Sequence, residues 1–410
     1  MEAARHDLLT FCQVTKPGYE STWFHEIIAY KLEDALARAM RGEKVRIILT
    51  IPPRHGKSEL ASIRFPAFAI GKYPNIEFIL STYGADLSET MGMKTRDVIS
   101  GEAYQAIFPG VELRADQKSK AKWMTNKGGT FTAVGIGGAV TGIGAKVILI
   151  DDAHKSREEA ESSTIRETVW QYYRDTLYSR LEGFGAIIII MQRWHCFSRK
   201  QLIQTENGME EIQDVRVGDK VLTPKGFQTV NHVMSNPIGD KKMLQLIILI
   251  DTANDVLEVT SDHLIKTKKG WVEAGKLSVG DSALHSYLDV DGTIKEEERN
   301  IMEINELEYH QNVYDLSVDC GELNVAGVTV HNCDDLVGRV LEESEKRKEE
   351  GQPGDEWEVI NFPAIAEEDE YHENKLVRKQ GDPLWKNKFP LDVLANIRAG
   401  SIYKWSSQYQ

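Results

Sequence analysis

Two cysteines and one asparagine stand at the ends of a segment whose composition differs from that of its flanks. Cys196 opens the segment, Asn332 closes it, and Cys333 follows at once. A thiolate attacks a thioester readily, and an asparagine side chain can cyclise on its own main chain and cleave the bond that follows. If residues 196–332 are removed, His195 is followed directly by Cys333, and the joined sequence is coherent as one protein. The spacing therefore predicts a segment that excises itself and joins its flanks without a cofactor.

Further residues inside the segment carry polar groups that such a reaction uses. Thr260 supplies a hydroxyl and His263 an imidazole, which suit the polarisation and protonation of a strained peptide bond. His331 precedes Asn332 and can donate a proton to its cyclisation. Each of these residues alone is more often ordinary surface or core, so it is the reactive ends of the segment that favour a catalytic interpretation of the set.

A second group of residues has the pattern of a phosphate-binding loop. An apolar, β-branched run at 45–51 predicts a buried strand, and Gly56-Lys57-Ser58 opens a helical pattern a few residues later. In such a loop, backbone N–H groups hold phosphate oxygens, Lys57 would reach the β- and γ-phosphates, and the Ser58 hydroxyl would ligate Mg²⁺. Ile51 replaces the first glycine of the usual motif. The motif alone therefore does not exclude an ordinary turn that opens a helix.

Two later strands end in polar residues that suit the same chemistry. The strand predicted at 146–150 leads into Asp151, which would ligate Mg²⁺, and Asp152, which could orient the attacking water. The strand predicted at 185–191 ends at Gln192, which either senses the γ-phosphate or simply closes a core strand. Together with Gly56-Lys57-Ser58, these carboxylates favour a site for ATP and Mg²⁺.

The elements that must position these residues fall into two groups. In the flanks, apolar strands alternate with helical patterns, such as the amphipathic helix predicted over 21–41. Between 196 and 332, short strands separated by glycine-containing turns predict a compact all-β domain. The net charge is −14, and the inserted segment, with 23 acidic and 13 basic residues, carries most of it.

The composition excludes several classes of protein. Four cysteines in 410 residues are too few for a disulfide scaffold. No apolar run reaches membrane-spanning length, and the N-terminus lacks a signal-peptide pattern. A cytosolic protein of two or three domains is the expectation.

The joined flanks resemble the large subunit of tailed-phage terminases. The resemblance rests on 52–58, on Asp151-Asp152, on Arg193-Trp194-His195 joined to 334–339, and on the tail 382–385. It covers 1–195 and 333–410, and it implies a discontinuous three-layer α/β P-loop ATPase of the RecA-like (ASCE) type. Arg54 would act near the γ-phosphate. The family usually has glutamate as general base, so Asp152 departs from it, with Glu158 and Glu159 as alternatives.

The same resemblance implies partners and a place of action. Terminase motors use ATP hydrolysis to drive double-stranded DNA through the phage portal into a procapsid. We therefore expect a terminase small subunit as a partner, a homo-oligomeric ring after splicing, no membrane, and the cytoplasm of a bacterium that carries the phage or prophage. The sequence ends at Gln410, about where a nuclease domain would begin, so no nuclease activity is expected.

The inserted segment resembles a class 1 mini-intein of the HINT fold. The resemblance rests on Cys196 with 218–221, and on the blocks 260–263, 313–316 and 330–332 before Cys333. It implies that Asp315 tunes the thiols and assists branching. A histidine usual near 320–321 is replaced by Cys320-Gly321, which implies slower coupling of branching to asparagine cyclisation. The segment has 137 residues, too few after His263 for a homing endonuclease.

The predicted domains are 1–195, the intein at 196–332, and 333–410, which completes the ATPase domain. Three alternatives stay open. The insert could be a cleavage-only HINT domain of the hedgehog kind, the flanks could form a helicase-like or other P-loop ATPase, or the chain could be a splicing-defective prophage remnant. The Asn332-Cys333 junction and the coherent flanks favour a splicing terminase precursor.

Overall fold

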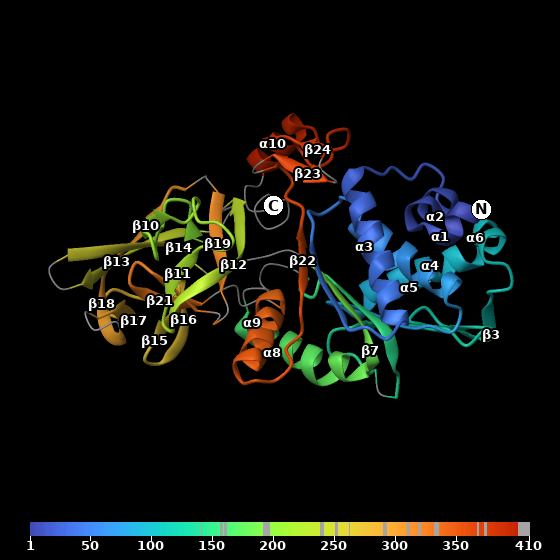
Figure 1. The fold of residues 1–410 in the computed structure, drawn as a ribbon, viewed down its shortest axis with the longest axis horizontal. Helices are drawn as coiled ribbons and strands as arrows, with labels where there is room; N and C mark the ends of the chain where they lie inside the picture. The colour runs from blue at the N-terminus through green and yellow to red at the C-terminus, as the bar shows by residue number, and fades with distance from the viewer. Residues whose placement is uncertain are drawn as a thin grey trace. The chain divides into compact units, whose positions relative to one another are not determined.

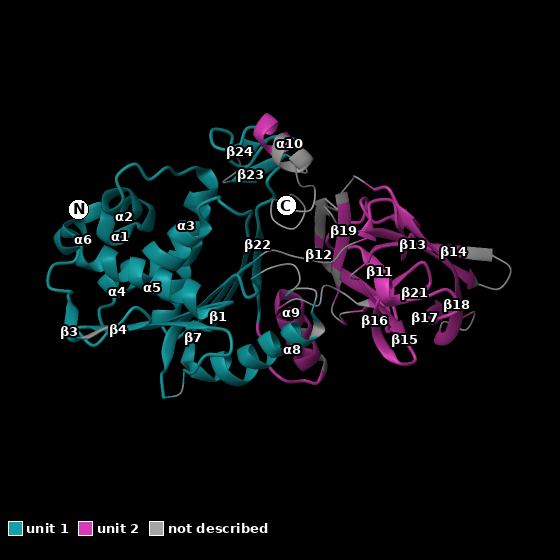
Figure 2. Cartoon of the chain, turned by 180° about the vertical axis from the view of Figure 1, so that it is seen from behind, with its two compact units in different colours: residues 1–192, 356–390 teal, residues 193–355, 391–410 magenta. Residues whose placement is uncertain are grey.

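A computed structural model of the chain describes most of its 410 residues. The described residues are 1–140, 142–155, 159, 162–191, 197–237, 242–250, 253–261, 263–289, 293–309, 312–318, 320, 322–331, 336–366, 369–372 and 375–400. The chain divides into two compact units, shown in Figure 2. Unit 1 comprises residues 1–192 and 356–390, and unit 2 comprises residues 193–355 and 391–410. No helix in the described ranges is long and apolar enough to cross a membrane.

Unit 1 is built on an eight-stranded sheet in the order β22-β1-β7-β6-β2-β5-β4-β3 (Figure 1). Strands β22, β1, β7, β6, β2 and β5 run parallel, and β4 and β3 are antiparallel additions at one edge. Strand β22 follows the inserted segment in the sequence, yet it pairs with β1 from Ile47↔Glu358 to Thr50↔Asn361. The sheet therefore contains strands from both sides of the insert. The strands are β1 (Val45–Thr50), β2 (Glu77–Thr82), β3 (Leu113–Lys118), β4 (Lys122–Thr125), β5 (Thr130–Gly135), β6 (Ala145–Asp151), β7 (Leu181–Ile190) and β22 (Glu358–Asn361).

The central strands of this sheet confirm the strands predicted from apolar runs. Every residue of β1 is buried, and so are the last residues of β6 and β7. Strands covered on both faces read as continuous apolar runs, because neither face meets water. The carboxyl ends of β1, β6 and β7 lie side by side through the pairs Leu49↔Ile190 and Asp151↔Ile190.

Helices pack against the sheet of unit 1. Helix α3 (Trp23–Met40) contacts β1, β6 and β7, and α5 (Ala85–Ser100) contacts β2 and β5. The predicted helix at 21–41 is thus confirmed, and a capping box between Thr22 and His25 fixes its start. The other elements are α1 (Glu2–His6), α2 (Leu8–Thr15), the π-helical turn η1 (Ser58–Arg64), α4 (Phe65–Lys72), α6 (Glu102–Ile107), α8 (Ser163–Gln171), η2 (Tyr172–Leu177), η3 (Tyr178–Arg180), β23 (Glu370–His372) and β24 (Lys375–Arg378).

Unit 2 holds a 14-stranded antiparallel sheet in the order β10-β9-β11-β12-β19-β8-β14-β13-β18-β17-β21-β15-β16, with β20 paired to both β21 and β9. Between 197 and 331 the described residues form strands, turns and one short helix, η4 (Ala274–Lys276), so the all-β prediction for the insert is confirmed. The strands are β8 (Phe197–Ser198), β9 (Leu202–Thr205), β10 (Gly208–Glu211), β11 (Lys220–Thr223), β12 (Gly226–Pro237), β13 (Met243–Ile250), β14 (Ala253–Thr260), β15 (Leu264–Thr267), β16 (Gly270–Glu273), β17 (Ser282–Leu288), β18 (Ile294–Leu307), β19 (Asn312–Val318), β20 (Glu322–Val325) and β21 (Val328–His331).

Most of the described core of unit 2 is one large apolar cluster, and a smaller cluster forms around Met243 and Val313. The large cluster includes Phe197, Leu246, Leu257 and Leu316, all fully buried, drawn from strands far apart in the sequence. Two helices from the downstream flank, α9 (Leu336–Glu349) and α10 (Leu391–Gly400), group with unit 2 rather than with unit 1. The predicted boundaries after 195 and after 332 fall at residues outside the described ranges and stay predictions.

Candidate functional sites

The loop after β1 lacks the first glycine of the usual phosphate-loop motif, and its residues with left-handed backbone conformation lie at other positions. Ile51 is buried and is not among the described residues with positive φ. The left-handed conformations fall instead at Arg54 (φ 61°) and Gly56 (φ 84°). Glycine is needed at 56 for a second reason, because a Cβ there would lie 2.7 Å from Nε2 of His25. The loop therefore does not need glycine at position 51.

The helix that follows starts with a π-helical turn, which has a local cause. Pro66 has no N–H and cannot complete a helical hydrogen bond to the Ser62 carbonyl four residues earlier. That carbonyl accepts a hydrogen bond from the Thr95 hydroxyl at 3.5 Å instead. The turn brings Ser58 and Ser62 to the same carboxylate: the Ser62 hydroxyl donates a hydrogen bond to Asp151 Oδ2 at 2.6 Å, and the Ser58 hydroxyl lies near enough to lower the pKa of Asp151.

Lys57 and the two aspartates after β6 form a compact charged group. The Lys57 Nζ forms an ion pair with Asp152 Oδ1 and lies 3.9 Å from Asp151 Oδ1. Asp152 adopts a left-handed conformation (φ 50°), and its backbone is held by hydrogen bonds from its N–H to the Ile190 carbonyl and from the Tyr83 N–H to its own carbonyl. The structure thus brings together Lys57, Ser58, Asp151 and Asp152, as predicted from their sequence context.

Burial and neighbouring charges shift the pKa values of Lys57 and Asp151. Burial alone would lower the pKa of Lys57, but the charges of Asp152 and Asp151 outweigh it and the pKa is raised. Burial, followed by the neighbouring charge of Asp152, raises the pKa of Asp151, although Lys57 and the two serine hydroxyls oppose this. Both Lys57 and Asp151 are almost inaccessible, with exposures of 6% and 0%.

The group has the donors that a magnesium ion needs. Asp151 Oδ1 is buried and accepts no hydrogen bond from any described residue, while the Ser58 hydroxyl lies close enough to bond the same carboxylate. In the described parts of the chain, no three His, Cys, Asp or Glu side chains gather as an all-protein metal site. Mg²⁺ is usually held by one or two carboxylates together with phosphates and water, so the residues present fit it.

A cavity of about 870 Å³ opens next to this group. On one side it is lined by Arg54, Gly56, Lys57 and Ser58 of the loop and by Asp152. The remaining wall comes from three parts of unit 1: the N-terminal residues Lys16, Gly18, Tyr19, Glu20 and His25, the loop neighbours Pro53 and Glu59, and the downstream residues Trp385, Lys388 and Phe389. Residues from upstream and downstream of the insert therefore share one pocket within unit 1.

Two neutral histidines hold the loop after β1 against this wall. The imidazole of His55 stacks on Phe389 with 4.6 Å between ring centres, and its Nδ1 hydrogen-bonds to the Pro53 carbonyl at 2.9 Å. Nε2 of His25 hydrogen-bonds to the His55 carbonyl at 3.0 Å, while the edge of the His25 ring meets Trp385. Burial lowers the pKa of both His25 and His55 to about 4, so both are neutral at pH 7.

Sequence reasoning missed residues of this pocket and of the charged group beside it. Ser62, Tyr19, Lys388 and Phe389 carried no motif, although the spacing of Ser62, four residues after Ser58, could have indicated it. Gln192 and Glu158 lie outside the described residues. The carboxylate of Glu159 accepts a hydrogen bond from the Lys155 N–H at 2.9 Å.

In unit 2, strand β8 organises the residues predicted for splicing. Phe197, the residue after Cys196, pairs on one side with Val259 and on the other with Tyr314. These partners are the immediate neighbours of Thr260 and Asp315. The strand register therefore brings the two predicted catalytic blocks to the start of the insert. Cys196, Asn332 and Cys333 themselves lie outside the described residues.

The polar side chains of this site are deeply buried. Thr260 and His263 have no exposed surface, and a turn links them through the His263 N–H to the Thr260 carbonyl at 3.0 Å. The His263 ring packs on Phe197 with 4.2 Å between ring centres. Asp315 is 1% exposed, and its Oδ1 accepts the Leu316 N–H at 2.9 Å. These contacts fix where each polar group can act.

His331 approaches the same region from the end of β21. Val330, its neighbour, pairs with Ile265 on β15, two residues after His263. His331 pairs with Glu322 on β20. Because β15 and β21 are antiparallel, the step from Val330 to His331 leads back along β15 toward His263.

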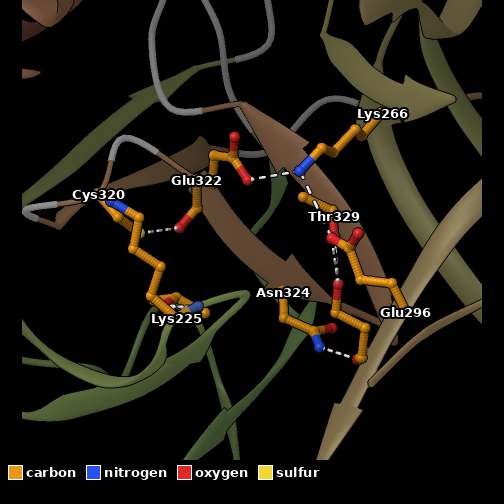
Figure 3. A network of polar contacts seen from close by, with 9 residues as sticks. Lys225, Lys266, Glu296, Cys320, Glu322, Asn324 and Thr329 are labelled. Atoms are coloured by element: carbon orange, nitrogen blue, oxygen red, sulfur yellow. Dashed lines mark hydrogen bonds and ion pairs between the residues drawn. The ribbon is translucent and has the colours of Figure 1, made fainter. Parts of the chain in front are cut away.

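Cys320, where a histidine was expected, lies in a polar network (Figure 3). Its thiol donates to the Glu322 carbonyl at 3.2 Å, and its N–H donates to Gln228 at 3.0 Å. Lys266 bridges Glu322 at 3.1 Å and Glu296 at 3.5 Å in the same network. Burial raises the pKa of the Cys320 thiol. The network gives the cysteine a structural role as a hydrogen-bond donor.

Comparison with known families covers both parts of the chain. Residues 48–230 match the family described as "Terminase large subunit, T4likevirus-type, N-terminal", and residues 195–286 match the family described as "Hint-domain". The two resemblances predicted from the sequence are therefore confirmed. The matches overlap at 195–230, and the structure assigns 197–230 to the strands of unit 2. The chain thus matches a terminase large-subunit model and a Hint-domain model in successive regions.

Several solved inteins are similar to this chain over about a third of its length. The gp41-1 intein is 23% identical, over 34% of this chain and 99% of that one, with a TM-score of 0.28. The DnaX mini intein from Spirulina platensis is 22% identical, over 33% and 99%, with a TM-score of 0.29. The DnaB intein from Synechocystis sp. PCC 6803 is 17% identical, over 34% and 99%, with a TM-score of 0.29. Among curated proteins, none matches the chain.

Proposed function

We propose that the chain is the precursor of a phage terminase large subunit, and that residues 196–332 leave it by protein splicing. The ligated host then acts as an ATP-driven motor. The proposal combines the two family matches with the chemistry of the two sites.

The observation that carries the splicing proposal is the position of β8. Its first residue, Phe197, lies between Val259 and Tyr314, next to Thr260 and Asp315. In the proposed reaction the Cys196 thiol takes up the acyl group of His195, and the Cys333 thiol then accepts that group. Cyclisation of Asn332 cleaves the bond that follows it, and His331 donates the proton to the departing Cys333 amine. This amine then displaces the Cys333 thiol from the acyl group, so that a peptide bond joins His195 to Cys333. Thr260 and His263 polarise the first bond, and Asp315 assists the transfer between thiols.

The observation that carries the ATPase proposal is the charged group at the ends of β1 and β6. Lys57 is close to Asp151 and Asp152, and Ser58 is close to Asp151, on a loop between a buried strand and a helix. We propose a P-loop ATPase of the RecA-like type, in which Ser58 and Asp151 hold Mg²⁺. Bound Mg²⁺ would supply charge neutralisation for the phosphates. Lys57 and Arg54 bind the phosphate oxygens, Asp152 orients the attacking water, and Gln192 senses the γ-phosphate.

Partners follow from the terminase match alone. We propose double-stranded DNA, a portal on a procapsid and a terminase small subunit as partners, with a homo-oligomeric ring after splicing in the bacterial cytoplasm. ATP turnover that DNA stimulates only in the presence of the portal would distinguish a packaging motor from a helicase-like ATPase.

Intact-mass spectrometry of the expressed chain tests splicing. We expect a free product of 137 residues and a ligated host of 273 residues. Cys196→Ala should abolish both products, whereas Asn332→Ala should block only the downstream cut and leave thiol-induced cleavage before Cys196. Cys12→Ala is the control, because Cys12 is buried in unit 1. Release of ligated host from Cys196→Ala would refute the mechanism.

ATP hydrolysis by the ligated host tests the second half of the proposal. Lys57→Met removes a cation that contacts phosphates most strongly in the transition state, so turnover should fall by at least a hundredfold. The control Lys94→Met changes an exposed lysine on α5. Equal turnover in the two variants would show that the phosphate loop is assigned wrongly.

A further inference from the structure

Lys388 stands at the rim of the cavity on the segment that follows the insert. The neighbouring side chains Trp385 and Phe389 are buried, while Lys388 itself is exposed. Its Nζ lies 4.3 Å from the centre of the Trp385 ring and 5.9 Å from that of Phe389. The lysine stem therefore rests on two aromatic faces, which restricts where its charge can go.

Lys388 shares a cavity with the phosphate loop. Lys388 lines the same cavity as Arg54 and Lys57, whereas Lys386, two residues earlier and also exposed, does not line it. The positive charge of Lys388 contributes to the lowered pKa of both His25 and His55, after the larger effect of burial. Those two histidines are the residues that hold the loop.

The cavity has a surplus of positive charge. Of its four cationic side chains, Lys16 forms an ion pair with Glu59 at 3.1 Å and Lys57 forms one with Asp152. No carboxylate in the described parts of the chain forms an ion pair with the other two, Arg54 and Lys388. MgATP carries about two net negative charges at neutral pH. An anion of that charge complements the two unpaired cations, and the third carboxylate of the wall, Glu20, is exposed to solvent.

We propose that Lys388 binds the phosphate oxygens of the nucleotide, so that the downstream flank supplies a second lysine to a site whose Lys57 comes from the upstream flank. This inference rests on the proposed ATPase function. An ammonium group that contacts phosphate through a charge-assisted hydrogen bond adds affinity, and exposure at the rim limits the gain through solvent screening.

The test uses the full chain with Cys196→Ala and Asn332→Ala, so that a single unspliced species is present. The affinity for MgATP is measured by isothermal titration calorimetry in four variants of that chain, one of which, Lys57→Met, tests the phosphate loop itself. Lys388→Met keeps an unbranched stem on the aromatic rings and removes the charge, and it should weaken binding roughly tenfold. Lys388→Arg should stay within about threefold, because it keeps the charge. Lys386→Met, the matched control, should bind as the parent does.

Each outcome has a definite meaning. Full affinity in Lys388→Met together with weakened affinity in Lys57→Met would overturn the inference and leave the proposed function intact. Full affinity in both variants would overturn the proposed function. If Lys388→Arg binds as weakly as Lys388→Met while both melt at the parent's temperature, the charge is not responsible and the inference is also wrong.

Discussion

The two candidate sites are prepared for chemistry in different ways. In unit 1 the reactive groups are charges that neutralise one another, since Lys57 pairs with Asp152 and lies close to Asp151. In unit 2 the described groups are placed by strand register, since β8 lies between β14 and β19. A site that turns over many times must return to a charged ground state after each cycle. A site that acts once only has to hold its backbone in place until the reaction is done.

This difference predicts which substitutions matter in each unit. In unit 1, removal of Lys57 leaves the buried Asp151 without a compensating charge, which is costly in low dielectric, whereas removal of the Asp151 charge leaves Lys57 paired with Asp152. In unit 2, loss of a packing contact beside β8 shifts the neighbouring polar groups, and catalysis is sensitive to such shifts. Three further experiments test this comparison, from the largest expected effect to the smallest.

The largest effect is expected where the two units are joined by the chain. Strand β7 ends at Ile190 between β1 and β6, and the insert begins five residues after Met191. We predict that the unspliced precursor hydrolyses ATP about a hundredfold more slowly than the ligated host, because misplacement by about 1 Å has a cost of that order. DNA-stimulated turnover is compared between a Cys196→Ala, Asn332→Ala, Cys333→Ala precursor and a host expressed without the insert.

Nucleotide binding by the same precursor serves as the internal control. The phosphate loop, Asp151 and the wall with Trp385 and Phe389 are assembled while the insert is present. Binding should therefore be retained when turnover is lost. Equal turnover in both proteins would show that the insertion point is tolerated and that splicing does not control the motor.

The next effect concerns packing beside β8. Phe197 is fully buried and its ring contacts the His263 imidazole. Phe197→Leu keeps an apolar side chain but loses the aromatic contact, which is worth about 1 kcal/mol. We predict that splicing slows by roughly tenfold, measured as the rate of appearance of ligated host. Phe227→Leu on β12 is the control, because Phe227 is only half-buried. If both variants splice at the rate of the parent, packing on Phe197 does not position His263.

Local features of both sites could be predicted from the sequence, because they depend on short stretches of chain. The apolar run of β1, the carboxylates after β6 and the blocks at Thr260 and Asp315 each carry a periodic or chemical signal. Each of these residues is observed at a strand end or within a strand. The catalytic roles assigned to them stay predictions.

Long-range arrangements could not be predicted in this way. Nothing in 356–390 indicates that β22 pairs with β1 or that Phe389 stacks on His55, because both contacts join residues more than three hundred positions apart. The role of Ser62 depends on a π-helical turn that Pro66 favours, which a motif at 56–58 does not encode. In unit 2 the strands were predictable, but the pairing of β8 with β14 and β19 follows only from the whole sheet.

The smallest effect expected is on stability, and it distinguishes a charge held for chemistry from one held for folding. Burial raises the pKa of Asp151 above its ordinary value, so ionisation of this carboxyl costs the folded state free energy at neutral pH. Asp151→Asn removes that cost and keeps an acceptor for Ser62, so the ligated host should gain about 1 kcal/mol in unfolding free energy at pH 7 while it loses ATP hydrolysis. The sign with pH follows: the advantage is absent well below pH 3.8, where the carboxyl is protonated in both states, grows as pH rises from 3.8 to the raised pKa of Asp151, and is constant above it. Denaturant unfolding at several pH values measures the difference in unfolding free energy. The control is Asp97→Asn on the exposed face of α5, for which the change should stay within about 0.5 kcal/mol.

A loss of stability in Asp151→Asn at pH 7 would contradict this prediction. It would mean that the ion pair between Asp151 and Lys57 stabilises the fold by more than burial of the carboxylate destabilises it. The charged groups of unit 1 would then serve the fold, as the strand register does in unit 2.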